Sequence, residues 1–401
     1  MFRRIVEITV SILVLTSVTI PIAMIFFIRK LLTQKEVLTP EEIYNRNSDI
    51  LTVQYFNTQY PFIRSLPLYI EVLKGEFGIT GVSIRTPKDS AEGMLNAKPG
   101  ILSIWLLRKL NKIDYEGRNA IDIEYLQNKS VKKDLMILIK SLLALTIKDT
   151  GEEYPDKINL LGISFLNRSM KDAVLMIEKV VSTGNKEAFY FMNPDCFNKL
   201  FVDLDYYQIM KSARNIFPDG SGVNMACKIM GSNLKQNING TDMLPYLCRM
   251  AEEREFGLFL LGAKPGVAEK MKKNLEQKYP KIIICGTHDG YFDRETQSEE
   301  IVSEINMSGA KILLVAFGVP YQEKWIEKHI SNLKVNVALG VGGLFDFYSG
   351  NMPRAPKWMR ELGIEWLFRL YKEPKRMWRR YVIGNPLFIK RVKQWKKKIA
   401  G

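Results

Sequence analysis

The chain has 401 residues, 46% of them hydrophobic and 25% charged, so it is long enough for two domains and too apolar to be disordered throughout. It has only two histidines, and its four cysteines form no Cys-x-x-Cys pair, which argues against a zinc finger and a histidine-built metal site. We expect the cysteines to be reduced core residues. The net charge is +15, and residues 354–401 carry +12 of it, with 15 Lys and Arg against three Glu.

The first distinctive segment is an uncharged run of 21 residues, 8–28, which is long enough to span a bilayer. Two arginines precede it and Arg29 and Lys30 follow it, so the distribution of positive charge gives no orientation. Pro21 lies within the run and would kink a helix. We interpret the run as a bent, re-entrant helix that enters and leaves on the cytoplasmic face of the inner membrane. A cleaved signal peptide and a plain spanning helix are the alternatives.

Residues 1–150 are expected to form a membrane-associated, α-rich domain. Residues 36–63 are polar with little periodicity and are interpreted as a connector. Apolar spacing predicts helices at residues 66–73 and 130–147, with a turn-rich region between them. The polar segment 148–156 is predicted to be the linker to the next domain.

From residue 157 the pattern alternates short apolar strands with amphipathic helices, which indicates an α/β domain with a parallel sheet covered on both faces. We place this domain at residues 157–352. Predicted strands are 158–163, 188–192, 257–261, 282–285, 312–317 and 335–341; predicted helices are 169–182, 196–213, 223–230, 267–278, 301–308 and 322–332. In such sheets ligands bind beyond the carboxyl ends of the strands.

Glycine clusters are predicted at several of those strand ends. Their backbone N–H groups could bind a diphosphate, although any one cluster could equally serve a tight turn. The glycines concerned are Gly220 and Gly222, Gly262 and Gly266, Gly318, and Gly340, Gly342 and Gly343.

The sequence PDGSG at residues 218–222 follows the short apolar segment 215–217 and precedes a predicted helix, which places Asp219 at the edge of the sheet. An aspartate there could be a general base or could bind a sugar hydroxyl, and a helix-capping or turn role is the alternative. Asp203 and Asp205 resemble a metal-binding Asp-x-Asp, but they lie within a predicted helix, where residues two apart point to different sides. We therefore expect no metal there.

Gln322 and Glu323 fall in the first turn of a predicted helix, facing the expected ligand edge, where they could contact a nucleotide or sugar. A favourable interaction of Glu323 with the helix dipole is the alternative.

Residues 353–401 are predicted to be a basic, Trp-rich appendage. Arg369, Arg376 and Arg379 have helical spacing, interrupted by Pro374, and suit a diphosphate or a lipid-facing stripe. Together with the N-terminal segment, this charge favours anionic lipid over nucleic acid as the partner of the appendage.

These motifs, in this order, resemble the WecG/TagA/CpsF family of bacterial glycosyltransferases over residues 157–385. The shared features are Asn193, PDGSG, Gly240 with Asp242, LLGAKPGVAEK, GTHDGYF, VAFGVPYQEKW, GVGGLFDFYSG, RAPKWMRELGIEWLFRL and EPKRMWRRY. The resemblance implies a Rossmann-like fold and an inverting, metal-independent enzyme without a cofactor. The implied reaction moves an N-acetylhexosamine, or its uronic acid, from a UDP-sugar to an undecaprenyl-diphosphate-linked sugar.

By position, the resemblance puts the catalytic base on Asp219, a conserved glutamine on Gln322 and the lipid-diphosphate arginines on Arg369, Arg376 and Arg379. We expect Asn193, Gly220, Gly222, Asp242, Gly262, Gln322 and Glu323 to contribute to substrate binding. Familiar members have Thr where this chain has Phe191 and Arg where it has Asn237. Both positions are expected near a sugar, so the identity of the sugars stays open.

Residues 66–87 and the KPGILS and DIEYLQNKS stretches resemble the monotopic phosphoglycosyl transferases. Their catalytic Asp-Glu precedes the Leu-Pro dipeptide, where this chain has Arg64 and Ser65. Because this pair supplies no carboxylate nucleophile, we predict that the domain is a catalytically inactive relative that anchors the chain.

The sequence thus predicts a transferase for cell-surface polysaccharide at the inner membrane, with its active site facing the cytoplasm. Alternatives are a non-catalytic membrane scaffold of the same pathway and a bifunctional transferase. Expected partners are the UDP-sugar, the lipid-linked acceptor and membrane lipid, without nucleic acid; self-association is left open.

Overall fold

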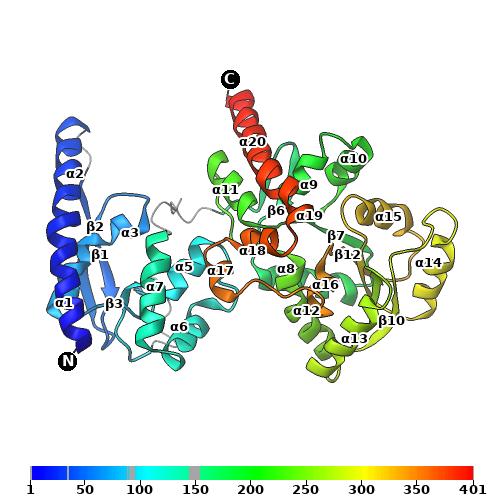
Figure 1. Ribbon diagram of the computed structural model, residues 1–401, viewed down its shortest axis with the longest axis horizontal. Helices are drawn as coiled ribbons and strands as arrows, with labels where there is room; N and C mark the ends of the chain where they lie inside the picture. Colours follow the sequence, from blue (N-terminus) through cyan, green and yellow to red (C-terminus); the bar gives the residue numbers. More distant parts are fainter. Residues whose placement is uncertain (1, 34–35, 88, 90–94, 144–153, 401) are drawn as a thin grey trace. The chain divides into compact units, whose positions relative to one another are not determined.

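The computed structural model describes residues 2–33, 36–87, 89, 95–143 and 154–400. The chain forms two compact units, Met1–Gly151 and Glu152–Gly401, and each is described by itself (Figure 1). The four cysteines are free thiols, as predicted.

The first unit begins with a long helix. Its parts follow one another directly: α1 (Phe2–Val14), a π-helical segment (Leu15–Thr19) and α2 (Ile20–Thr33). Residues Arg4–Phe27 are long and apolar enough to cross a membrane. Pro21 follows the π-helical segment and is accommodated there without a loop, because the wider π turn relieves the helix where proline cannot donate a hydrogen bond. The structure does not confirm the predicted re-entrant bend.

The prediction of a connector at residues 36–63 is wrong. Strands β1 (Leu38–Tyr44) and β2 (Ile50–Phe56) form an antiparallel hairpin there. The Oδ1 atom of Asn45 accepts hydrogen bonds from the backbone N–H groups of Asn47 and Asp49, at 2.9 and 3.0 Å, and so closes the turn. Ile43 is the one fully buried residue of β1, which explains why the sequence of this strand lacks an apolar pattern.

The rest of the first unit is a mixed α/β body around one core. Its elements are α3 (Pro61–Arg64), a 3₁₀ turn (Leu66–Leu68), α4 (Tyr69–Lys74), the parallel pair β3 (Gly78–Thr80) and β4 (Gly100–Leu102), α5 (Ile104–Leu110), α6 (Gly117–Gln127) and α7 (Val131–Leu143). The helix predicted at 130–147 is confirmed up to residue 143, and residues 144–147 lie outside the described part of the chain.

The second unit opens with an antiparallel hairpin, β5 (Lys157–Leu160) and β6 (Ile163–Leu166). We predicted one strand at 158–163. Leu161 and Gly162 interrupt it with positive φ angles of 54° and 84°, which make a tight turn.

The predicted parallel sheet is confirmed, and it has six strands in the order β10-β9-β11-β12-β7-β8. The strands are β7 (Glu187–Met192), β8 (Asn215–Pro218), β9 (Leu258–Gly262), β10 (Ile284–His288), β11 (Ile312–Ala316) and β12 (Val337–Gly340). All neighbours pair in parallel, so their carboxyl ends share one edge. Except at β10, their side chains are almost all buried.

Helices precede, connect and follow these strands: α8 (Met170–Ser182), α9 (Pro194–Lys199), α10 (Leu204–Ser212), α11 (Ser221–Met230), α12 (Gly240–Arg254), α13 (Val267–Lys278), α14 (Ser298–Met307), α15 (Tyr321–His329) and α16 (Leu344–Tyr348). A capping box of Ser169 and Asp172 starts α8. The single helix predicted at 196–213 is wrong, because α9 ends at Lys199 and Asp203 caps a second helix. Helix α12 was not predicted; Asn239 caps it and Pro245 lies inside it.

The predicted appendage consists of short helices and one longer one, drawn from orange to red in Figure 1: α17 (Lys357–Glu361), α18 (Glu365–Lys372), α19 (Pro374–Trp378), a π-helical segment (Arg379–Gly384) and α20 (Asn385–Ala400). Phe388 of α20 is buried against Phe197 of α9, with ring centroids 5.4 Å apart. The appendage is therefore packed on the α/β core.

Candidate active site

The adjacent strands β7 and β8 bring Asn193 and Asp219 together. Met192 and Pro218 are paired at the strand ends, and the backbone N–H of Asp219 donates to the carbonyl of Met192 at 2.8 Å. The Asn193 amide caps α9 by accepting from the N–H groups of Asp195 and Cys196, and its Nδ2 donates to Asp219 Oδ2 at 3.3 Å. Asn193 therefore holds the Asp219 carboxyl at the edge of the sheet.

Opposing influences set the acidity of Asp219. Burial raises the pKa of this carboxyl, while the hydrogen bond from Asn193 and the positive charges of Arg380 and Arg369 lower it. The result is a pKa above the usual value for aspartate. A carboxylate with a raised pKa is a stronger base, and the two arginines favour its ionised form.

Arg380 is the residue that our sequence analysis missed. It is half-buried and interacts electrostatically with Asp219 and Asp195, whereas Arg376 and Arg379 are exposed. Arg376 forms an ion pair with Glu373 at 2.8 Å. The interruption expected at Pro374 is present, because α18 ends at Lys372 and α19 begins at Pro374. A π-helical segment then follows from Arg379, so the three predicted arginines do not lie on one continuous α-helix.

The loop after Asp219 is built from glycines for two different reasons. Gly220 has a φ of 95°, and its N–H donates to Asn237 Oδ1 at 2.6 Å. A Cβ at Gly222 would lie 2.5 Å from Pro194 Cγ. Ser221 Oγ donates to the carbonyl of Gly363 at 3.1 Å, so this loop also contacts the appendage.

The two positions that depart from the familiar pattern have different surroundings. Asn237 holds the backbone of Gly220 next to Asp219. Phe191 is buried, with its ring 5.9 Å from that of Phe217 and beside Gly240. Phe191 is therefore a core residue behind the site.

Asp242 connects the appendage to the α/β core. It lies in the first turn of α12, where its N–H donates to Asn239 Oδ1 at 2.8 Å and its Oδ2 accepts from Asn239 Nδ2 at 2.7 Å. Its Oδ1 is 2.5 Å from Arg354 and 3.5 Å from Arg360. The carboxylate thus has protein partners on both oxygens.

Gln322 and Glu323 lie in the first turn of α15, where the sequence placed them, and they are buried, with 2% and 1% of their surface exposed. Gln322 Oε1 accepts from the N–H of Gly342 at 2.9 Å, and its Nε2 donates to Glu323 Oε1 at 2.9 Å. A Cβ at Gly340 would lie 3.0 Å from Gln322 Nε2. The pair therefore fixes the glycine-rich loop after β12.

Glu323 carries an unusual carboxyl. Burial raises its pKa to about 7, against the hydrogen bond from Gln322. Within the described residues, its Oε2 atom has no hydrogen-bond partner. A negative charge on Glu323 is consequently costly inside the protein.

Gly262 ends β9 at a point where strands approach closely. Its φ is 132°, and a Cβ would lie 2.7 Å from the backbone of Ala316 at the end of β11. The following residue, Ala263, donates its N–H to the carbonyl of Ala316 at 3.0 Å. Strand packing therefore explains this glycine without a bound diphosphate.

Asp203 and Asp205 both contact Lys324, with oxygen–nitrogen distances of 2.8 and 3.4 Å. Asp203 also caps α10 through the N–H of Tyr206. Our placement of this pair inside one helix was wrong, but both carboxylates are paired with an ammonium group.

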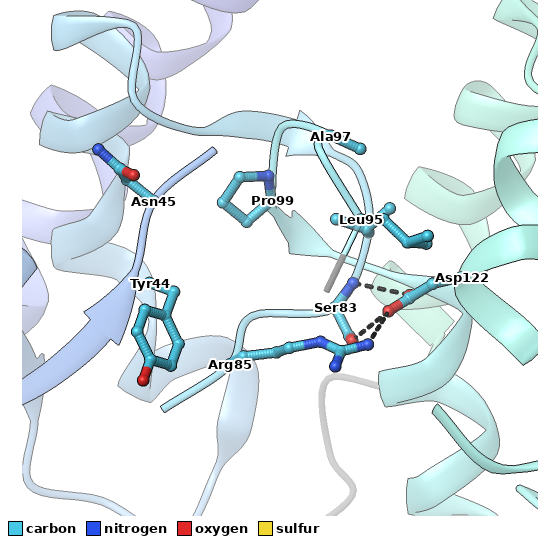
Figure 2. A pocket seen from close by; sticks show the side chains of 9 residues that line it. Tyr44, Asn45, Ser83, Arg85, Leu95, Ala97, Pro99 and Asp122 are labelled. Atoms are coloured by element: carbon cyan, nitrogen blue, oxygen red, sulfur yellow. Dashed lines mark hydrogen bonds and ion pairs between the residues drawn. The ribbon is translucent and has the colours of Figure 1, made fainter. Parts of the chain in front are cut away.

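The first unit has a small, open pocket lined by nine residues (Figure 2). Ser83 donates to Asp122 through its N–H at 2.8 Å and through its Oγ at 2.6 Å, and Arg85 lies 3.5 Å from Asp122. Figure 2 shows these three side chains pointing toward one another. Asp122 is the carboxylate among the nine lining residues, and its oxygens are already bound.

Arg64 and Ser65 also have protein partners. The Arg64 guanidinium forms an ion pair with Glu41 of β1 and lies 4.5 Å from the centre of the Tyr55 ring. Ser65 Oγ donates to the carbonyl of Pro61 at 2.8 Å. The position before Leu66, where the monotopic phosphoglycosyl transferases have Asp-Glu, thus holds an arginine paired with Glu41.

Two family models match the chain. That of the glycosyl transferase WecG/TagA/CpsF family matches residues 158–400, and that of the bacterial sugar transferases matches residues 62–148. An N-acetylglucosaminyldiphosphoundecaprenol N-acetyl-beta-D-mannosaminyltransferase of Bacillus subtilis (strain 168) is 33% identical over 220 residues, which are 55% of this chain and 84% of the relative. An enzyme with the same name from Staphylococcus aureus (strain MW2) is 31% identical over 245 residues, 61% of this chain and 94% of the relative.

Replacing Glu323 by Gln should make stability less dependent on pH. The folded protein holds a proton on Glu323 up to about pH 7, whereas an unfolded glutamate releases it near pH 4.5. Between these values the free energy of unfolding of the wild type falls relative to that of Glu323→Gln, by about 3 kcal/mol in total. Chemical denaturation at pH 4.5, 6 and 8 measures this difference.

The matched control is Glu327→Gln, because Glu327 is exposed on the same helix. It should track the wild type at each pH. An equal stability difference between Glu323→Gln and wild type at pH 4.5 and pH 8 would contradict the account of Glu323.

Proposed function

Because this chain belongs to the WecG/TagA/CpsF family of glycosyltransferases, we propose that it transfers a sugar from a UDP-sugar to an undecaprenyl-diphosphate-linked sugar, with inversion at the anomeric carbon. The names of the two relatives support a lipid-diphosphate acceptor and an N-acetylhexosamine donor. The observation that carries the proposal is the buried Asp219 carboxyl at the sheet edge, held by Asn193 and influenced by the positive charge of Arg380. The product serves cell-surface polysaccharide synthesis.

In the proposed mechanism, Asp219 accepts the proton of the acceptor hydroxyl as that oxygen attacks the anomeric carbon of the donor. The raised pKa makes Asp219 a competent base, and the positive charge of Arg380 keeps enough of it ionised at neutral pH. The bond from the sugar to UDP breaks, and arginine side chains and loop N–H groups stabilise the diphosphate that leaves, without a metal.

The appendage is the proposed holder of the acceptor's diphosphate. Arg376 and Arg379 are exposed on it, while Arg369 lies 5.3 Å from the Phe347 ring and near Gly343 in the loop after β12. Exposed aromatic residues, Tyr371 and Trp378, accompany these cations. Such a surface suits the headgroup region of a membrane.

The first unit is proposed to attach the enzyme to the inner membrane and to lack transfer activity of its own. Arg64 and Glu41 form an ion pair at the position that precedes Leu66, and Asp122 is fully engaged by Ser83 and Arg85. The pair that precedes Leu66, Arg64 and Ser65, supplies no carboxylate nucleophile.

Asp219→Asn should reduce turnover at least 1,000-fold, on the order expected when a general base is removed from a site that is otherwise intact. Asparagine is isosteric, so the Met192 backbone contact and the fold should persist. UDP release from UDP-N-acetylhexosamines in the presence of a lipid-diphosphate acceptor measures the loss. Turnover within tenfold of the wild type would remove Asp219 from the role of base.

Arg380→Gln should move the acidic limb of the pH profile of kcat/KM to higher pH. The reason is that the positive charge of Arg380 lowers the pKa of Asp219, so the loss of this charge raises that pKa further. Arg379→Gln is the neighbouring comparison: its exposed charge should change KM for the lipid acceptor and leave the limb in place. A limb that moves in neither variant, or only in Arg379→Gln, would contradict this assignment.

The nucleotide product separates the proposed activity from that of a bifunctional enzyme. Glycosyl transfer releases UDP, whereas phosphosugar transfer to undecaprenyl phosphate releases UMP. Full-length protein should form UDP with the lipid-diphosphate acceptor and no UMP with undecaprenyl phosphate. UMP formation that persists in Asp219→Asn would show that the first unit is active.

A further inference from the structure

The N-terminal helix has two apolar faces with different surroundings. Residues on one face contact the core of the first unit; they include Val10, Val14, Leu15, Ile22, Ala23 and Phe26. Residues on the other face are exposed; they include Ile5, Ile12, Leu13, Ile20, Met24 and Ile25. A helix that is hydrophobic all round needs a second apolar partner for its outer face.

The inner face rests on the same protein body along its whole length. Near its start, the Arg4 guanidinium donates to the carbonyls of Val72 and Leu73 at 2.6 and 2.7 Å. In the middle, the π-helical segment packs against the turn Leu66–Leu68. Near the end, Phe26 stacks on Phe56 of β2 at 5.3 Å. Arg4 and Phe26 are about 33 Å apart along the axis at 1.5 Å per residue.

The hydroxyl groups on the exposed face of the helix are bonded in a way that tolerates lipid. Thr16 Oγ1 donates to the carbonyl of Ile12 at 2.9 Å, and Ser17 Oγ donates to that of Leu13 at 2.5 Å. Hydroxyls satisfied by their own helix need no water. The exposed face is therefore equipped for an apolar environment.

The body beneath the helix rules out a spanning orientation. It contains the two-stranded sheets β1–β2 and β3–β4, and open sheet edges are not tolerated in the hydrocarbon region of a bilayer. A helix perpendicular to the membrane would carry this body into the bilayer, because the contacts extend over about 33 Å, close to the hydrocarbon thickness. A re-entrant turn would also separate the π-helical segment from Leu66–Leu68, which it contacts.

We propose that this helix lies in the plane of the membrane, with its inner face on the protein and its outer face in the headgroup and upper acyl region of an anionic bilayer. The inference refines the membrane attachment assumed under the proposed function. In the sequence, basic residues border both ends of the apolar run, where they can meet lipid phosphates in this orientation. Most helices that lie in a membrane surface have one apolar face in the lipid and one polar face in water. In this helix the outer face is the one that enters the lipid, and the inner face packs on the protein.

A second copy of the chain fits this face less well than lipid does. A strip about 36 Å long and about 10 Å wide offers roughly 400 Å², while a stable interface buries about 800 Å² on each partner. Its exposed side chains are mainly large, whereas close helix pairing in membranes favours small ones.

Depth measurements on the full-length protein in vesicles of phosphatidylcholine and phosphatidylglycerol test the proposal. Spin labels are placed one at a time on cysteines at Ile5, Ile12, Ile20 and Ile25, in a background with the partly exposed Cys285 replaced by Ser. Accessibility to oxygen and to a water-soluble nickel chelate gives the depth. All four positions should lie at one depth, within about 10 Å of the phosphates. A label at Met307, which is 80% exposed in the second unit, is the aqueous control.

Each other outcome overturns the in-plane orientation in a recognisable way. A spanning helix would put Ile5 and Ile25 at opposite surfaces with Ile12 deep, and a re-entrant helix would make the middle labels deep and both end labels shallow. Spin–spin coupling between copies without lipid exposure would indicate a protein partner. The absence of any lipid contact would contradict the membrane attachment itself. A second label set at Leu13 and Met24 repeats the measurement if a first-set variant does not fold.

Discussion

The candidate active site depends on the parallel pairing of β7 with β8. This pairing places the backbone N–H of Asp219 on the carbonyl of Met192 and so brings the Asp219 side chain within hydrogen-bond distance of Asn193. Asn193 can hold the carboxyl because its own side chain is fixed as the cap of α9. A single residue thus links the end of a strand, the start of a helix and the proposed base.

The appendage contributes charged residues to the surroundings of Asp219. It is joined to the core through Asp242 with Arg354 and Arg360, and through Ser221 with Gly363. These contacts carry Arg369 and Arg380 to positions where their charges oppose the effect of burial on Asp219. A buried carboxyl without them would be protonated over a wider pH range. The same segment that is proposed to bind the lipid diphosphate therefore also tunes the base.

Local signals predicted the parallel sheet and the position of Asp219, because strands of buried apolar residues and turns rich in glycine can be recognised in sequence. Arg380 could not be chosen over Arg379, since the π-helical segment that begins at Arg379 changes the angular spacing on which the prediction relied. The burial of Gln322 and Glu323 follows from the loop after β12, which is distant in sequence. Hairpin β1–β2 was missed because burial falls mainly on β2, through packing that the sequence does not display.

The most direct test of the central claim is a structure of the full-length protein with UDP and a non-reacting analogue of the lipid-linked acceptor. The account predicts the attacking hydroxyl within about 3 Å of an Asp219 carboxylate oxygen, with Arg380 beside that carboxyl. A bound acceptor whose hydroxyl contacts a different side chain, with Asp219 turned away from it, would contradict the account.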